Sequence, residues 1–285
     1  IKDKKWNSAL KSASKVKDRE FRNLITWMYL KTTRNGASFG EYKNFIEQNN
    51  NYPRINRIRF LAESKIYLRN NSPTSIINWF DKYPPLGGMG KIKLAEAYLE
   101  KGQVDKVEEL IKEGWETATI SKNDLGYYRA KFKKFIDSED HVKRADYLAW
   151  EKKYWDLKRM LKYLPKDQRA LYNARQILMS NSYGVDNAIS KVPEYLKKDP
   201  GLEYDRLRWR NRRGRLEGSL EILYRNSIKT EEQMVRPDKW WEQRESVVRS
   251  LIYKKRYKTA YKISSEHALS AGPSFAEAEW LSGWI

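Results

Sequence analysis

Apolar residues recur along this chain at three- and four-residue intervals, the spacing of one face of an amphipathic helix. Between positions 94 and 115 they form two such runs separated by Gly102, namely Leu94, Ala97 and Tyr98, then Val104, Val107, Leu110 and Ile111. The pattern predicts a helix, a tight turn at the glycine and a second helix. Similar stripes begin at Tyr154, Leu216 and Tyr257, so we expect the helical hairpin to recur.

Local signals for helix starts agree with this interpretation. Ser72 precedes Pro73, which places an N-cap residue before a proline in the first helical turn. Arg236 precedes Pro237 and an acidic residue in a similar way. Residues typical of strands are few, since Val occurs nine times and Thr eight times among 285 residues. The sequence therefore predicts an all-α fold without a sheet.

The predicted hairpins are unevenly spaced. Their first apolar residues, from Val104 onward, lie 50, 62 and 41 residues apart, whereas a tetratricopeptide array has a constant period of about 34 residues. Stacked helix pairs bury their apolar faces against neighbouring pairs and propagate as a superhelix. No linker rich in Gly, Ser or Pro divides the chain. We expect one α-superhelical domain over residues 1–285, an irregular α-solenoid of helix pairs.

Composition narrows the possible classes of protein. With 40% hydrophobic and 13% aromatic residues the chain is expected to fold, although 33% of its residues are charged. It has no apolar stretch of the roughly 20 residues that a membrane-spanning helix needs. It has no cysteine and only two histidines, His141 and His267. We therefore expect neither a metal site nor a thiol nucleophile.

The densest basic segment, called here the arginine cluster, is residues 206–215, with six arginines in ten positions. On a helix, Arg206, Arg210 and Arg213 share one face. Guanidinium groups bind carboxylates and phosphates through paired hydrogen bonds, so this face is a candidate anion-binding or glycan-binding ridge. The alternative is that some of these arginines pair with acids on adjacent helices while the others are solvated.

Eleven tryptophans form the second candidate feature. Aromatic rings stack on sugars and bases, but most of these tryptophans follow the apolar stripes, where packing between helices explains them. Trp240 and Trp241 differ, because adjacent residues on a helix point about 100° apart. We expect that both cannot face the same core, so that one is exposed or packs between repeats. This makes Trp240 and Trp241 candidate glycan-binding residues.

The acidic residues predict no active site. The sequence has no GxGxxG, P-loop, HExxH or GxSxG motif. Glu-Ser dipeptides occur at Glu63-Ser64 and Glu245-Ser246, both within expected helices. His267 is expected near a helix end, where an imidazole complements the helix dipole. We assign no catalytic residue and expect no cofactor.

Three segments resemble the N-terminal superhelical domain of soluble lytic murein transglycosylases. The first two are Pro84-Pro85-Leu86 with the residues from Gly90 to Ala97, and the stretch from Asp199 to Arg215. The third is the most specific, and it comprises Arg236-Pro237, Trp240-Trp241, Ala260-Tyr261, His267, Leu269-Ser270 and Phe275 to Ile285. The resemblance is weak before Tyr52-Pro53 and strong toward the C-terminus.

This resemblance implies the α-superhelical part of a periplasmic enzyme that cleaves peptidoglycan glycan strands and leaves 1,6-anhydromuramic ends. In that family the catalytic glutamate belongs to a Glu-Ser motif in a C-terminal lysozyme-like domain, followed by a Gly-Leu-Met-Gln-type motif. Neither Glu63-Ser64 nor Glu245-Ser246 has such a follower. The resemblance therefore implies a non-catalytic chain without the lysozyme-like domain, whose partners are peptidoglycan and that catalytic domain.

Two other functions compete with this expectation, a basic helical repeat that binds nucleic acid and a protein-interaction scaffold. The formal net charge is +20, which favours anionic partners. However, the excess is +9 over residues 1–142 and +11 over residues 143–285, so the charge is spread along the chain. The uneven repeat spacing also lacks the regular code of helical repeats that read RNA. We regard nucleic acid as the less favoured partner.

Overall fold

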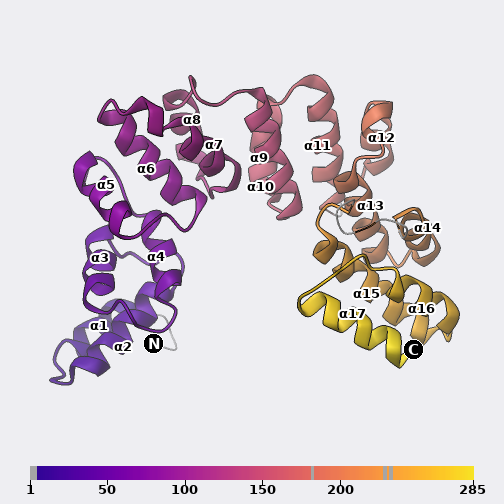
Figure 1. Ribbon diagram of the computed structural model, residues 1–285, viewed down its shortest axis with the longest axis horizontal. Coiled ribbons are helices and arrows are strands. Elements are labelled where there is room, and N and C mark those ends of the chain that lie inside the picture. Colours follow the sequence, from indigo (N-terminus) through magenta and orange to yellow (C-terminus); the bar gives the residue numbers. More distant parts are fainter. Residues whose placement is uncertain (1–4, 181–182, 227–229, 231–233) are drawn as a thin grey trace. The chain divides into compact units, whose positions relative to one another are not determined.

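A computed structural model describes residues 5–180, 183–226, 230 and 234–285. Over these residues the chain forms seventeen α-helices and no strand, so the all-α prediction is confirmed (Figure 1). The helices are α1 (Trp6–Ala13), α2 (Arg19–Lys31), α3 (Phe39–Gln48), α4 (Ile55–Glu63), α5 (Pro73–Lys82), α6 (Gly88–Glu100), α7 (Glu108–Thr117), α8 (Lys122–Lys131), α9 (Ser138–Trp150), α10 (Tyr154–Met160), α11 (Lys166–Leu178), α12 (Val185–Ser190), α13 (Pro200–Arg212), α14 (Leu216–Asn226), α15 (Pro237–Tyr253), α16 (Tyr257–Ser265) and α17 (Pro273–Trp284).

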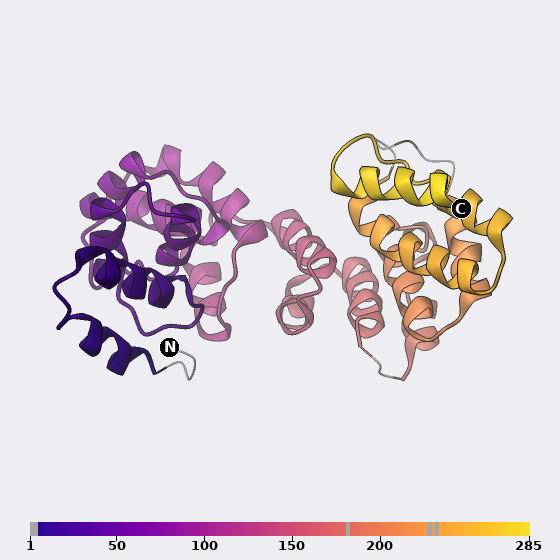
Figure 2. The same cartoon turned by 90° about the horizontal axis from the view of Figure 1, so that it is seen from below.

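The chain divides into two compact units, Ile1–Arg144 and Ala145–Ile285, called here the N-terminal and C-terminal units. The boundary lies inside α9, so one helix belongs to both. In each unit most packing is between consecutive helices, such as α5 with α6 and α6 with α7, or α15 with α16 and α16 with α17 (Figures 1 and 2). The described part of the chain also contains three short 3-10 helices, at Val104–Lys106, Leu161–Tyr163 and Glu194–Leu196.

Side-chain caps fix where several helices begin. The Ser72 hydroxyl accepts the Ser75 N–H, and Pro73 occupies the first turn of α5 as predicted. Ser38 and Glu41 form a reciprocal capping box at the start of α3. The predicted start at Pro237 is also confirmed, with Arg236 before it in the left-handed backbone conformation.

The predicted hairpin around Gly102 is confirmed. α6 ends at Glu100, and Gly102 has a φ of +72°, a conformation that glycine adopts without strain. Val107 and Ile111 are fully buried in the second arm, whereas Val104 is 47% exposed. Placing Val104 on the buried stripe was therefore wrong, because α7 begins only at Glu108 and Val104 lies in the preceding 3-10 turn.

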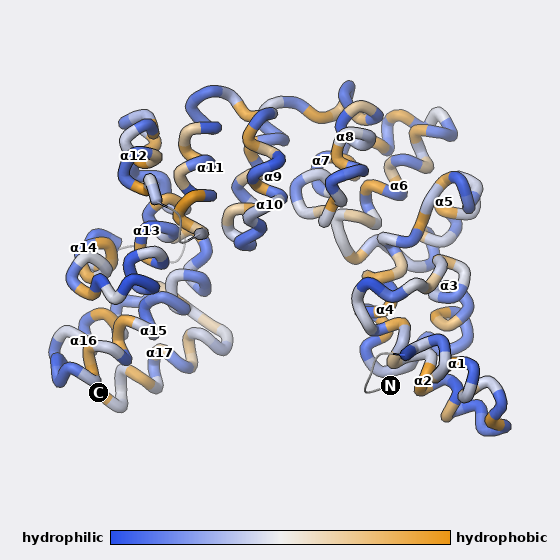
Figure 3. Tube along the Cα trace, turned by 180° about the vertical axis from the view of Figure 1, so that it is seen from behind, coloured by the Kyte–Doolittle hydropathy of each residue, from blue (hydrophilic) through white to orange (hydrophobic). Residues whose placement is uncertain are grey.

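A second correction concerns α16. The stripe that begins at Tyr257 and continues with Ala260 and Tyr261 was expected to be buried. Ala260 is buried as expected, beside Ile263, whereas Tyr257 and Tyr261 are 49% and 54% exposed. Small and branched side chains suit the close contact with α15 and α17, while the tyrosines keep their hydroxyls in water. Within single helices the hydropathy alternates in the same manner, as Figure 3 shows.

Glycines let α6 and α7 approach closely. A Cβ atom on Gly88 would lie 2.5 Å from the Ala118 nitrogen, and one on Gly114 would lie 2.9 Å from the Gly88 oxygen. Any larger residue would push the two helices apart.

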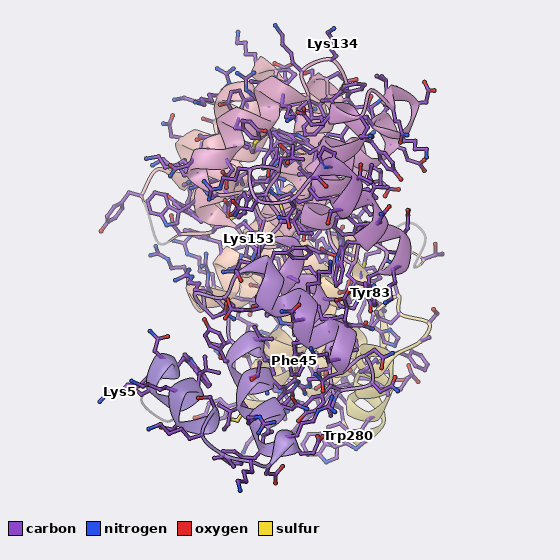
Figure 4. The ribbon with its side chains drawn as sticks, turned by 90° about the vertical axis from the view of Figure 1, so that its left-hand side faces the viewer. Lys5, Phe45, Tyr83, Lys134, Lys153 and Trp280 are labelled. Carbon is purple, nitrogen blue, oxygen red and sulfur yellow. The ribbon has the colours of Figure 1, made fainter. Side chains whose placement is uncertain are left out.

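Charged side chains project from the outside of the N-terminal unit, as the labelled Lys134 does in Figure 4, whereas Phe45 is buried.

The core of the C-terminal unit contains residues of α13 through α17 together with Trp150 of α9. Its largest members are Trp150, Tyr204, Trp240 and Trp241, with aliphatic residues of α14, α15 and α16 around them. Among the described residues, no helix is both long enough and apolar enough to cross a membrane.

Candidate functional site

The arginine cluster occupies the last turns of α13 and the turn into α14. Asp199 caps α13 by accepting the Leu202 N–H at 2.8 Å, and Pro200 follows it in the first turn. Gly214, with a φ of +64°, reverses the chain after the helix. The cluster therefore starts on one helix and ends on a tight turn, so its arginines do not share a single surface.

Arg206 and Arg210 are ion-paired. Arg206 donates to Glu203 at 2.7 Å, and Arg210 lies 3.0 Å from Glu221 of α14. Arg225 joins both glutamates, at 3.2 Å from Glu203 and 3.7 Å from Glu221. Three guanidinium groups thus share two carboxylates. This agrees with the alternative expectation that some arginines of the cluster pair with acids. Partly exposed pairs of this kind contribute about 0–1 kcal/mol each, so the network mainly neutralises the ridge.

Three further arginines of the cluster make other contacts. Arg212 donates to the carbonyls of Met179 at 3.0 Å and Leu178 at 2.6 Å, and so caps the C-terminal end of α11. Arg213 and Arg215 are exposed, and their guanidinium carbons lie 5.3 and 4.7 Å from the ring centre of Trp209. Of the predicted ridge, Arg213 is the member at the surface, and Arg215 accompanies it.

A small cavity of about 170 Å³ adjoins this turn. Asn211, Gly214 and Arg215 line one side of it, and Ser246 and Ser250 of α15, with Lys254 just after that helix, line the other. Two cations, two hydroxyls and an amide make it a polar site that suits an anionic or hydroxyl-rich group. Sequence reasoning missed the α15 residues, because only the fold brings them beside a segment more than thirty positions earlier.

Beneath the cluster lies a buried cation that the sequence did not reveal. Arg175 of α11 is fully buried, with Nε 2.8 Å from Asp205 and Nη1 2.7 Å from Asp146. Burial lowers the pKa of Arg175, but the nearby Asp205, Asp146 and Asp199 outweigh it and raise that pKa, while burial raises the pKa of Asp205 and Arg175 opposes that shift. The Arg175 guanidinium also lies 5.2 Å from the Trp150 ring centre. These contacts hold α13, and with it the arginine cluster, against α9 and α11.

The expectation for Trp240 and Trp241 was wrong. Both belong to one core and are only 1% and 2% exposed. The reason is that α15 packs against α13 on one side and against α16 and α17 on the other, so directions 100° apart are both covered. Trp240 lies 5.8 Å from Tyr204, and Trp241 donates to Glu277 at 3.0 Å. Neither ring is available for stacking on a glycan in this structure.

Other tryptophans are exposed instead. Trp155, Trp280 and Trp284 are 65%, 61% and 62% exposed. Trp280 and Trp284 stand four residues apart on α17 and therefore share a face, and Figure 4 shows Trp280 at the periphery of its unit. The period-of-four spacing was visible in the sequence, but it does not tell a buried face from an exposed one.

The glutamates of both Glu-Ser dipeptides are engaged in structural contacts. Glu63 is buried and accepts the N–H groups of Leu86 and Gly87 at 2.5 and 3.0 Å, ahead of α6. Burial raises the pKa of Glu63 to about 7, although these backbone hydrogen bonds lower it. Glu245 pairs with Arg249 at 2.6 Å along α15. Glu63 serves as a cap and Glu245 as an ion-pair partner.

His267 lies just after the end of α16 and is 5% exposed. Its Nδ1 accepts the Leu269 N–H at 2.9 Å, so Nε2 carries the hydrogen and donates to Glu279 at 2.9 Å. The ring ties the loop after α16 to α17 and is not a free general base. In the described part of the chain, no group of three or more histidine or acidic side chains is placed to hold a metal ion.

Comparison with known proteins gives no relative. No protein-family model matches the chain, and neither a curated protein nor a solved structure matches it significantly.

Proposed function

We propose that this chain is a non-catalytic helical scaffold of a lytic transglycosylase, which holds peptidoglycan for cleavage by a separate lysozyme-like domain. In this proposal the consecutive helix pairs form an irregular superhelix, and the parent enzyme acts in the periplasm on glycan strands to leave 1,6-anhydromuramic ends. The chain itself contributes binding and positioning.

The proposal rests on one observation. Several C-terminal residues on which the family resemblance depends contact one another in the structure. Trp241 donates to Glu277, and its ring lies 6.1 Å from that of His267. His267 in turn bonds Glu279 and lies 5.8 Å from the ring of Phe275. Residues between positions 241 and 279 therefore form one connected cluster between α15 and α17. The residues that carry the resemblance in this segment thus lie together in the structure, which supports the proposal.

The surface chemistry is compatible with murein as the ligand. Peptide stems of murein carry carboxylates, and the chain carries a net charge of +20. Arg213 and Arg215 lie at the surface of the C-terminal unit beside Trp209, and Trp280 and Trp284 are exposed on α17. Exposed guanidinium groups bind carboxylates, and exposed indole rings stack on sugar faces.

Co-sedimentation with purified cell-wall sacculi tests the proposal. We expect the chain to sediment with sacculi at low salt and to be released at high salt, because exposed charge pairs are screened. A double variant, Arg213→Ser with Arg215→Ser, is expected to lower the bound fraction several-fold. Lys166→Ser with Lys258→Ser removes the same charge from other exposed positions of the C-terminal unit, and serves as the control. Absence of co-sedimentation at low salt would overturn murein binding.

The same preparations separate the competing nucleic-acid function. Phosphate contacts give an affinity that falls steeply with salt, with a logarithmic slope of about 0.7–0.9 per contact. Submicromolar binding of duplex or single-stranded nucleic acid with such a slope would favour a nucleic-acid scaffold over the murein proposal.

A further inference from the structure

The N-terminal unit contains a cavity that the murein proposal does not use. It has a volume of about 320 Å³ and lies among α6, α8 and the segment after α4. Tyrosines form much of its wall, namely Tyr67, Tyr127 and Tyr128. Its charged lining consists of Arg69, Lys93, Glu96 and Asp124. The cavity is named here the Lys93 cavity.

Lys93 is the unusual member of this lining. It projects from α6 and is only 3% exposed, in contrast with most lysines, which keep their ammonium group in water. Its Nζ lies 4.3 Å from the ring centre of Tyr67 and 5.3 Å from that of Tyr128. Cation–π contacts partly compensate its burial. No described residue forms a hydrogen bond or ion pair with this ammonium, so its three donors face the cavity and the two rings.

The carboxylates of the cavity already have partners. Glu96 accepts one hydrogen bond from the Tyr127 hydroxyl and lies 3.2 Å from Lys131, which also pairs with Glu100. Asp124 accepts the Ser121 hydroxyl at 2.7 Å at the start of α8. Burial lowers the pKa of Lys93, and the nearby Glu96 and Asp124 oppose that shift without bonding the ammonium. Lys93 is therefore the group whose hydrogen bonds remain unmet.

We propose that the Lys93 cavity binds a single carboxylate group of a small ligand, with Lys93 as the buried anchor and Arg69 as a second cation at the exposed rim. The tyrosine rings then pack against the body of the ligand. A carboxylate satisfies the ammonium with charge-assisted hydrogen bonds, which are about twice as strong as neutral ones. This inference rests on the geometry of the N-terminal unit and is independent of the proposed murein function.

The charges of the cavity favour one negative charge over several. Its lining brings two cations, Arg69 and Lys93, together with the two anions Glu96 and Asp124. A phosphate dianion or a nucleic-acid strand would place additional negative charge beside these carboxylates, and like charges disfavour that arrangement. One carboxylate matches the single unpaired ammonium.

Calorimetric titration of the whole chain with matched ligand pairs tests the inference. N-acetylmuramic acid carries a lactyl carboxylate that N-acetylglucosamine lacks, and N-acetyl-D-alanyl-D-alanine carries a carboxylate that its C-terminal amide lacks. We expect at least one acid to bind at least tenfold more tightly than its neutral counterpart. The acid that binds more tightly shows whether the carboxylate of the ligand belongs to a sugar acid or to a peptide C-terminus. Inorganic phosphate is the third arm and is expected to bind more weakly.

Variants assign any binding to the cavity. Lys93→Met keeps the length of the side chain and removes the charge, and we expect it to lose at least tenfold in affinity for the acid. Lys91→Met changes a partly exposed lysine of the same helix that pairs with Glu113 outside the cavity, and we expect it to bind as the wild type does. Arg69→Gln, at an exposed position where folding is not at risk, should weaken binding about threefold or more.

Several results would overturn the inference. These are equal binding of acids and their neutral counterparts, no binding of either acid, tighter binding of phosphate, and unchanged affinity in Lys93→Met. The melting temperature of unliganded Lys93→Met provides a separate check on folding. We expect it to equal or exceed that of the wild type, because the substitution removes a buried charge without a hydrogen-bond partner. If that variant fails to fold, the Arg69→Gln titration decides the matter.

Discussion

Arg175 and Asp205 form a fully buried ion pair, with Nε and Oδ2 2.8 Å apart, in the interior of the C-terminal unit. The pair joins α11 to α13 and lies directly beneath the segment that carries the arginine cluster. Its partners Asp146 and Trp150 come from α9. The most basic segment of the sequence is thus positioned by an arginine outside that segment.

Breaking this ion pair is expected to be costly. Asp205→Asn removes the charge that compensates the Arg175 guanidinium, and loss of one partner of a buried pair typically costs 3–5 kcal/mol. Because Asp146 still contacts Arg175, we expect a loss of about 3 kcal/mol in the free energy of unfolding, measured in urea. Asp156→Asn breaks the partly exposed pair with Arg159 and should cost less than about 1 kcal/mol. Equal losses in the two variants would contradict the structural role of Asp205.

Gly201 is required for the approach of α13 to Arg175. A Cβ atom there would lie 2.3 Å from the guanidinium carbon of Arg175, and overpacking of this kind costs about 1–3 kcal/mol. We expect Gly201→Ala to be destabilised by this amount in urea unfolding. Gly126→Ala is the matched control, because no neighbouring atom lies within 4 Å of its added Cβ in α8. That variant should gain up to about 1 kcal/mol from helix propensity.

Glu63 makes stability depend on pH. Its pKa is about 7 in the folded chain against an ordinary value of 4.5, so the folded state holds this proton more tightly than the unfolded state does. The stabilisation is fully present below pH 4.5 and is lost as the pH rises through 7. We expect Glu63 to account for a loss on the order of 3 kcal/mol over this interval.

The Glu63→Gln variant checks this dependence. The amide does not titrate, so the component of the slope between pH 4.5 and 7 that comes from Glu63 should vanish in urea unfolding curves taken across that range. Glu245→Gln alters the other Glu-Ser dipeptide, whose glutamate lies in an ion pair along α15, and should leave the slope in place. A slope that persists in Glu63→Gln would show that another group causes it.

Tryptophans of the C-terminal unit are expected to divide into two energetic classes. Trp241→Ala opens a cavity in the core and should cost about 3–5 kcal/mol. Trp284→Ala changes an indole that is 62% exposed and should change the free energy of unfolding by less than about 0.5 kcal/mol. Urea unfolding measures both, and a large loss in Trp284→Ala would indicate that this ring is covered in the native protein.

Several expectations from the sequence were accurate because their causes are local. The Ser72-Pro73 start and the turn at Gly102 each depend on residues within one or two helical turns. The stripe at Val104 was wrong because the sequence did not show that α7 begins four residues later. Trp240 and Trp241 were misjudged because burial of both depends on helices on two sides of α15.

In the candidate sites, too, some features were visible in the sequence and others depend on how the helices pack. The arginine cluster was visible as a run of charge, but the acids that neutralise Arg206 and Arg210 come from the preceding turn of α13 and from α14. Lys93 gave no signal in the sequence, because a lysine on a helix is ordinarily solvated. Its burial depends on Tyr67 and Tyr128, which lie 26 positions before and 35 positions after it.

The sequence by itself determined that this chain is all-helical and basic, and where several of its helices begin and turn. These properties follow from periodicity, caps and net charge, which act over a few residues or over the whole composition. The tertiary structure alone decided which charges are paired, which tryptophans are exposed and which lysine faces a cavity. Burial and ion pairing depend on groups far apart in the sequence, and packing of the helices brings those groups together.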